Sequence, residues 1–313
     1  MLELIDRRRF LKQSLALTGA ALTGAGAVRA LPPTVLAQGG PVSMNPADSR
    51  MPALFVGHGS PMNAIEDNRW SRAFRTLGAE LPRPKAILAV SAHWFVPGTY
   101  LTGEREPKTI HDFGGFPREL YEIQYRAPGA PELAQRVARL VGEDVASLRT
   151  DWGLDHGTWS ILRHLFPLAD VPVIQLSLNG HLAPAGHLEI GRALAPLRGE
   201  GVMIVGSGNL VHNLRDAMGR MAAMSAAADD DGATTPDWAA RFDTDLRTAL
   251  EQRDSAFLVQ APASEDGRRS HPSLDHYLPI LYAVGAGEAN DAVSFPIEGF
   301  DLGSISMRTV RIG

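Results

Sequence analysis

Short apolar segments alternate along this chain with longer segments in which apolar residues recur at helical spacing. Each apolar segment has four to eight residues and is bounded by Gly, Pro or Ser. Segments of this kind are typical of strands that are buried on both faces of a parallel sheet. The alternation predicts an α/β fold, namely a single domain with a largely parallel central sheet and helices on both faces. The expected strands cover residues 53–56, 86–90, 171–178 and 202–205, and the expected helices cover 70–77, 131–141, 158–165 and 185–197.

The last third of the chain carries weaker signals. Residues 229–232 read Asp-Asp-Asp-Gly, which predicts an exposed loop before a helix at 236–251. Another helix is expected to begin near Pro272 and to run to residue 284. Residues 303–310 alternate between apolar and polar side chains, which predicts a strand with one solvent-facing side.

The first residues resemble an export signal. Residues 6–12 read Asp-Arg-Arg-Arg-Phe-Leu-Lys, a weakly apolar stretch follows at 14–28, and small residues stand at the end of 35–37. This order predicts a twin-arginine-type signal peptide over residues 1–37, a linker over 38–50 and a functional domain over 51–313. The apolar stretch is too short for a stable membrane span.

Such a signal implies export of the folded protein to the periplasm or beyond, with transient contact to the twin-arginine machinery. The alternative is a short amphipathic helix belonging to the fold. Glycines interrupt residues 17–27, which makes them a poor helix and favours the signal peptide.

Composition restricts the chemistry that the domain can carry. The net charge of −5 and pI of about 6.1 provide no basic surface for nucleic acid. The chain contains no cysteine, which excludes thiolate ligands, disulfides and cysteine nucleophiles. It contains 10 histidines, so a metal would be bound through nitrogen and oxygen.

Three of these histidines follow predicted strands. His58, His93 and His212 come shortly after the strands that end at residues 56, 90 and 205. Ligands of open α/β sheets lie outside the carboxyl ends of the strands, so a shared metal site is expected there. Imidazole suits zinc, copper, iron and nickel. Zinc would activate water for hydrolysis, whereas iron(II) would serve oxygen chemistry, and this pattern alone leaves both open.

Six short motifs occur in a fixed order between residue 51 and the end of the chain. Together they resemble the DODA-type (4,5-DOPA) extradiol dioxygenases of the class III ring-cleaving superfamily. The motifs are Gly-His-Gly-Ser-Pro-Met-Asn at 57–63, Ser-Ala-His-Trp-Phe at 91–95, His-Asp-Phe-Gly-Gly-Phe-Pro at 111–117, Asp-His-Gly-Thr-Trp at 155–159, Gly-Asn-Leu-Val-His-Asn at 208–213 and His-Tyr-Leu-Pro at 276–279.

The resemblance implies a role for each matching histidine. His58, His93 and His276 would hold the metal, with His276 at the start of the helix expected near Pro272. His212 would be the acid–base group, although some descriptions of the family count it as a fourth ligand. The wider superfamily uses two histidines and a glutamate, so the histidine at position 276 leaves iron and zinc open.

The resemblance also implies the substrate and the site that binds it. His111, Asp112 and His156 would line the substrate pocket. The expected reaction opens the ring of a small catechol, DOPA-like or protocatechuate-like, with O2 and non-haem iron(II), while zinc(II) stays possible. Two alternatives stay open, a zinc-dependent hydrolase or amidase on the same scaffold and a non-enzymatic metal-binding protein.

Overall fold

The computed structural model describes residues 50–226 and 234–313, which belong to one compact unit spanning 44–313. The predicted signal peptide, the predicted linker up to residue 49 and the predicted loop at 229–232 lie outside the described residues. Within the described ranges, no helix combines the length and apolarity needed to cross a bilayer.

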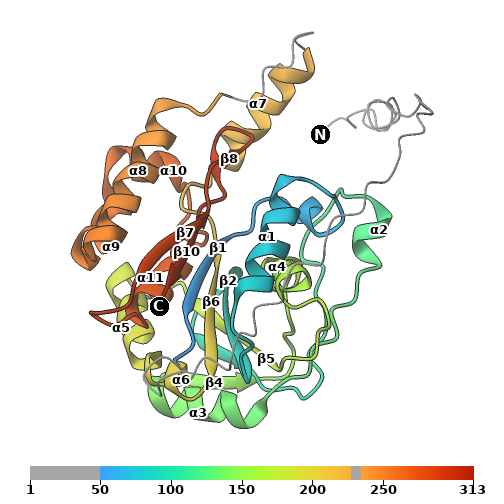
Figure 1. Ribbon diagram of the computed structural model, residues 1–313, viewed down its shortest axis with the longest axis vertical. Helices are drawn as coiled ribbons and strands as arrows, with labels where there is room; N and C mark the ends of the chain where they lie inside the picture. Colours follow the sequence, from blue (N-terminus) through green and yellow to red (C-terminus); the bar gives the residue numbers. More distant parts are fainter. Residues whose placement is uncertain (1–49, 227–233) are drawn as a thin grey trace, which may run out of the picture. The chain divides into compact units, whose positions relative to one another are not determined.

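An eight-stranded sheet forms the centre of the unit (Figure 1). Its four middle strands, in the order β5-β2-β6-β1, are parallel, whereas β10 and β7 continue the sheet beyond β1 in antiparallel fashion. The prediction of a largely parallel central sheet is therefore confirmed. The complete order is β4 (Ala146–Arg149), β3 (Thr99–Thr102), β5 (Val173–Asn179), β2 (Ala86–Val96), β6 (Val202–Gly208), β1 (Ala53–Gly57), β10 (Thr309–Ile312) and β7 (Val293–Ile297), and a separate hairpin pairs β8 (Phe300–Asp301) with β9 (Ile305–Ser306).

Helices cover both faces of the sheet. Alternate residues of each middle strand point to opposite faces, and both sets are apolar, so each face needs a covering layer. Leu54 and Val56 of β1 join the core with α1 (Arg69–Glu80) and α4 (His156–Leu165). Phe55 joins the core on the other face, which holds α3 (Pro131–Val141), α5 (Pro184–Leu194), α8 (Asp237–Gln252) and α11 (Pro279–Gly285). The remaining helices are η3 (Pro61–Ala64), α2 (Arg118–Tyr121), α6 (Pro196–Gly199), α7 (Leu214–Ala226), α9 (Ser255–Gln260), η4 (Ala261–Ala263) and α10 (Glu265–Ser270).

Strand β2 is longer than predicted. The apolar run ends at Val90, but β2 continues to Val96 after an irregularity in its pairing with β5 between Val90 and Phe95. An irregularity of this kind re-aims the side chains that follow it. His93 therefore lies within β2 and not after its end.

The helix expected near Pro272 begins later. Residues 272–278 form bends and turns, and α11 starts at Pro279. Proline fits the first turn of a helix because it lacks the N–H group that the interior requires. His276 is consequently held in a turn before the helix, which corrects its predicted place at a helix start.

The predicted strand at 303–310 is also divided. Residues 303 and 304 form a turn, 305–306 belong to β9 and 309–310 to β10, with Met307 and Arg308 between the two strands. The Met307 N–H donates to the carbonyl oxygen of Gly299, and the Arg308 guanidinium is paired with buried Asp243. Because Met307 and Arg308 make these contacts, the strand-to-strand hydrogen bonding is interrupted between β9 and β10.

Candidate active site

The predicted metal ligands come together at the carboxyl ends of the central strands. His58 directly follows β1, and His93 lies in β2 beyond its pairing irregularity; β6 runs between these two strands. His276 reaches the same edge because its carbonyl oxygen accepts a hydrogen bond from the Asn209 N–H, just after β6. A Cβ atom at Gly208 would lie 2.2 Å from that oxygen, so this approach requires glycine.

The geometry of the three histidines fits one metal ion. One ring nitrogen from each lies within 4.8 Å of the others. The Nε2 atoms of His58 and His93 are 3.3 Å apart. Two nitrogens that bind one ion at about 2.0–2.1 Å in a tetrahedral arrangement are separated by roughly this distance. His58, His93 and His276 could therefore hold a metal together.

Each of these three rings has a partner for its other nitrogen. The Nδ1 atom of His58 lies 2.9 Å from Ser207 Oγ, and that of His276 lies 2.6 Å from Asp275 Oδ2. The Nδ1 atom of His93 lies 3.3 Å from a carboxylate oxygen of Asp112. Partners of this kind orient a ligating imidazole and leave Nε2 for the metal.

The electrostatics of the cluster favour neutral rings. Burial, followed by the charges of the neighbouring histidines, lowers the pKa of His58 and of His276 well below the ordinary value. Burial also lowers the pKa of His93 to about 3. A metal ligand must be unprotonated, so these three side chains are ready to bind a cation at neutral pH.

His212 lies beside the ligand cluster and not within it. Its ring stacks on that of His276, with centroids 3.5 Å apart and planes 3° from parallel. Its backbone N–H donates to the Ser270 carbonyl oxygen. Among the described residues, two groups have metal-ligand spacing, His58 with His93 and His276 and a second of His93, Asp112 and His156; neither includes His212. Burial lowers the pKa of His212 to about 4, so its ring is neutral at neutral pH.

Asp112 and His156 form a tightly bonded pair. Asp112 Oδ1 accepts the His156 backbone N–H and Oδ2 accepts the His156 Nδ1–H, each at 2.9 Å. Burial by itself would raise the pKa of Asp112, but the bonds and charge of His156 bring it below its usual value. The ionised carboxylate therefore orients His156 and His93. Asp112 Oδ2 contacts both of these rings, and the substrate contact expected of Asp112 stays a prediction.

His111 lies outside the histidine cluster, with Phe113 between its ring and that of His156. Its Nε2–H donates to the Ile123 carbonyl oxygen at 3.0 Å, and its ring contacts Phe113 and Trp159. Phe113 in turn meets His156 edge-on, with centroids 5.3 Å apart. The segment that begins at His111 thus provides an aromatic wall beside His156, and Phe113 lies closer to the cluster than His111.

The sequence analysis did not single out Asp155, a buried carboxylate that directly precedes His156. Asp155 is fully buried and caps the N-terminus of α4 by accepting the Thr158 N–H. It also accepts a hydrogen bond from the Gln175 side-chain amide. Burial raises its pKa to about 6. This cap fixes the first turn of α4, which contains His156. The sequence signal for the cap was an Asp directly before the predicted helix, a residue type preferred at that position.

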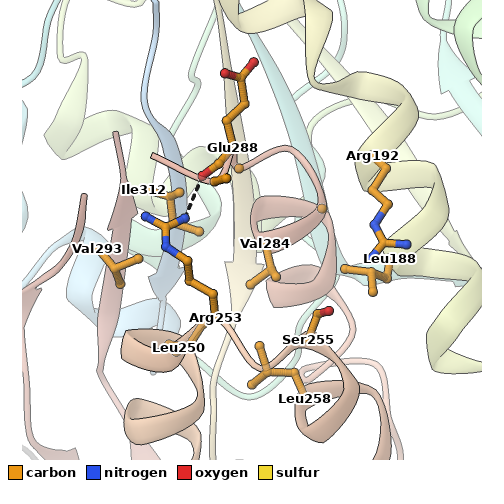
Figure 2. A pocket seen from close by; sticks show the side chains of 13 residues that line it. Leu188, Arg192, Leu250, Arg253, Ser255, Leu258, Val284, Glu288, Val293 and Ile312 are labelled. Carbon is orange, nitrogen blue, oxygen red and sulfur yellow. Dashed lines mark hydrogen bonds between the residues drawn. The ribbon is translucent and has the colours of Figure 1, made fainter. Parts of the chain in front are cut away.

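A separate cavity of about 290 Å³ lies away from this cluster (Figure 2). Ile312 lines it and pairs with Ala53 at the start of β1, so the cavity lies at the opposite end of the strands from His58. Its lining is largely apolar, and Arg253 at its edge donates to the Glu288 carbonyl oxygen. The cavity is therefore no part of the histidine site.

Comparison with known proteins agrees with this geometry. Residues 52–303 match the family described as the catalytic LigB subunit of aromatic ring-opening dioxygenase. The chain is 45% identical over 271 residues to a 4,5-DOPA dioxygenase extradiol of Escherichia coli, covering 85% of this chain and 96% of that protein. It is 37% identical over 273 residues to the protein of the same name from Beta vulgaris, covering 84% and 97%.

The solved structures include a similar chain. The crystal structure of an uncharacterized protein from Escherichia coli K12 superposes with a TM-score of 0.71 at 41% identity, covering 84% of this chain and all of that one. Both the fold and the resemblance predicted from the six motifs are thus confirmed. The chain belongs to the LigB family of aromatic ring-opening dioxygenases and is an oxidoreductase of the extradiol dioxygenase class.

Proposed function

We propose that this protein opens the ring of a small catechol with O2, using a metal held by His58, His93 and His276. The observation that carries the proposal is the convergence of three neutral imidazoles, two buried and one half-buried, each with an outer polar partner. Three protein ligands leave coordination positions for a substrate. Relatives named 4,5-DOPA dioxygenase extradiol support a catechol substrate.

The metal is proposed to be iron(II), which supplies the electron transfer between catechol and O2 when bound. The protein supplies the geometry and the proton handling. His212 is placed to take a proton from a catechol hydroxyl and to return one later, since its ring is neutral and adjacent to His276. Phe113 provides an aromatic surface beside His156, against which a planar substrate ring could pack.

One coupled measurement tests this function. Protein purified without oxygen should contain iron, and with a panel of catechols it should consume O2 and yield a product cleaved beside the diol. Zinc-loaded protein without O2 consumption would contradict the dioxygenase and favour the zinc-dependent hydrolase. Metal-loaded protein without turnover of any class of substrate would favour a metal-binding protein.

His156 is proposed to contact the substrate. Its Nδ1–H is bonded to Asp112, so Nε2 is the nitrogen that can meet a ligand. A hydrogen bond from His156 to an ionised substrate carboxylate would be charge-assisted, and such a bond contributes roughly 1.5–3 kcal/mol. His156→Ala should therefore lower kcat/KM by ~10- to 100-fold for a carboxylated catechol and by less for an uncharged one.

Steady-state kinetics with a matched pair of catechols, with and without the carboxylate, measures this difference. Equal losses for the two substrates would show that His156 does not bind the carboxylate. It would then act on the hydroxyls or on the position of His93.

We also propose that the protein is exported through the twin-arginine pathway. The family match starts at residue 52, beyond the motif at 6–12 and the small residues at 35–37. The exported protein should start near Gln38, as mass spectrometry of its N-terminus can determine. Replacing Arg7 and Arg8 with lysine should retain the full-length precursor in the cytoplasm. An intact N-terminus in cells with a working export pathway would contradict this prediction.

A further inference from the structure

Ser207 lies between the two strands that carry metal ligands. It belongs to β6, where it is paired with Val56 of β1 on one side and with Ser91 of β2 on the other. Its side chain is fully buried. It contacts two groups: Oγ lies 2.9 Å from His58 Nδ1 and 2.5 Å from the Gly157 carbonyl oxygen.

The protons available on the three groups determine which atom donates in each hydrogen bond. A hydroxyl has one proton to donate, and a carbonyl oxygen has none. The short contact to Gly157 therefore requires the Ser207 hydroxyl to donate to the Gly157 carbonyl oxygen. The remaining contact must then run the other way, with the His58 Nδ1–H donating to Ser207 Oγ. His58 is consequently the tautomer whose Nε2 carries a lone pair, and that Nε2 is the atom 3.3 Å from His93 Nε2.

The same hydroxyl connects the cluster to α4. Gly157 follows His156 in the first turn of that helix. A Cβ atom at Gly157 would lie 2.5 Å from Ser91 Oγ and 2.8 Å from His93 Cδ2, so the helix terminus packs directly against the site. The hydroxyl of Ser207 thus joins a ligand of the cluster to the turn that presents His156.

We propose that Ser207 is a positioning residue that fixes the tautomer of His58, aims its Nε2 at the metal and ties it to the N-terminus of α4. This inference rests on the proposed metal site. Groups that orient a ligating imidazole in this way are typically worth 10- to 100-fold in metal affinity. Ser207 would therefore determine how tightly the metal is held without touching it.

Two measurements test the proposal on the full chain. In metal-free protein labelled with ¹⁵N-histidine, long-range proton–nitrogen spectra should show His58 as the Nδ1–H tautomer, and Ser207→Ala should let the Nε2–H form appear. In chelator competition with Zn²⁺ and Fe²⁺, Ser207→Ala should raise the metal dissociation constant by ~10- to 100-fold. Ser207→Thr retains the hydroxyl and should recover most of that affinity.

Ser177→Ala is the matched control. Ser177 is another fully buried strand serine of the same sheet, and its hydroxyl donates to the Gly98 carbonyl oxygen at 3.1 Å. It should lose thermal stability comparably to Ser207→Ala in the metal-free state while keeping wild-type metal affinity. Unchanged affinity in Ser207→Ala, or an Nε2–H tautomer of His58 in the wild type, would overturn the proposal. If the wild type bound no metal, the proposed function would fail, and the tautomer spectra alone would decide the role of Ser207.

Discussion

Replacing His276 with alanine should remove both the bound metal and the ring-opening activity. The substitution deletes one of three nitrogens that lie within 4.8 Å of each other and leaves Asp275 without the ring that it orients. Metal affinity should fall by more than ~100-fold, which is the upper end for residues that only orient a ligand. Metal content after dialysis, together with O2 consumption on a catechol, measures the effect.

A buried histidine outside the site provides the control for this substitution. His187 is fully buried, and its Nδ1 atom bonds the Tyr282 hydroxyl between α5 and α11. His187→Ala should reduce stability, because it leaves a cavity and an unpaired hydroxyl, yet retain the metal. Retention of a full metal complement by His276→Ala would assign the third ligand to another residue, such as the adjacent His212 or a member of the group His93, Asp112 and His156.

The features that the sequence predicts well are those with a local physical cause. Buried parallel strands need continuous apolar runs, so β1, β2, β5 and β6 are visible in the pattern, and histidines that follow such runs are brought to one edge by the parallel arrangement. The convergence of His58 and His93 follows from this reasoning alone. His276 required the family motif, since no strand precedes it.

Features that depend on neighbouring elements were not predictable in this way. Strand β2 continues past Val90 because Phe95 and Val96 pair with Leu178 and Asn179 of β5, which a reading of β2 alone cannot show. The short strands β4 and β7 likewise form the edges of the sheet, where exposed positions weaken the apolar pattern.

The glycines around Ser207 illustrate the same limit. Residues 206–208 read Gly-Ser-Gly, and glycine allows the backbone to be approached closely by another group. In the structure these glycines belong to β6, and the backbone that approaches is that of the chain itself. Cβ atoms at Gly206 and Gly208 would lie 2.5 Å from the Pro279 carbonyl oxygen and 2.2 Å from that of His276. The outer partners Ser207, Asp112 and Asp275 were recognisable only once these contacts were known.

The second large effect is expected from His212→Ala, which should keep the metal and lose most of the turnover. The ring of His212 is stacked on His276 and not directed with the three ligand nitrogens, so its removal leaves the ligand set complete. Its lowered pKa keeps the ring unprotonated, as a general base must be before it takes a proton, and loss of an acid–base group typically costs ~10²- to 10⁴-fold in rate. Metal content and kcat should be measured on the same preparation.

His212→Phe separates loss of the stacked ring from loss of proton transfer, because it restores an aromatic ring without a proton acceptor. This variant should hold metal as the wild type does and be as inactive as His212→Ala. Complete loss of metal from both variants would instead make His212 a ligand.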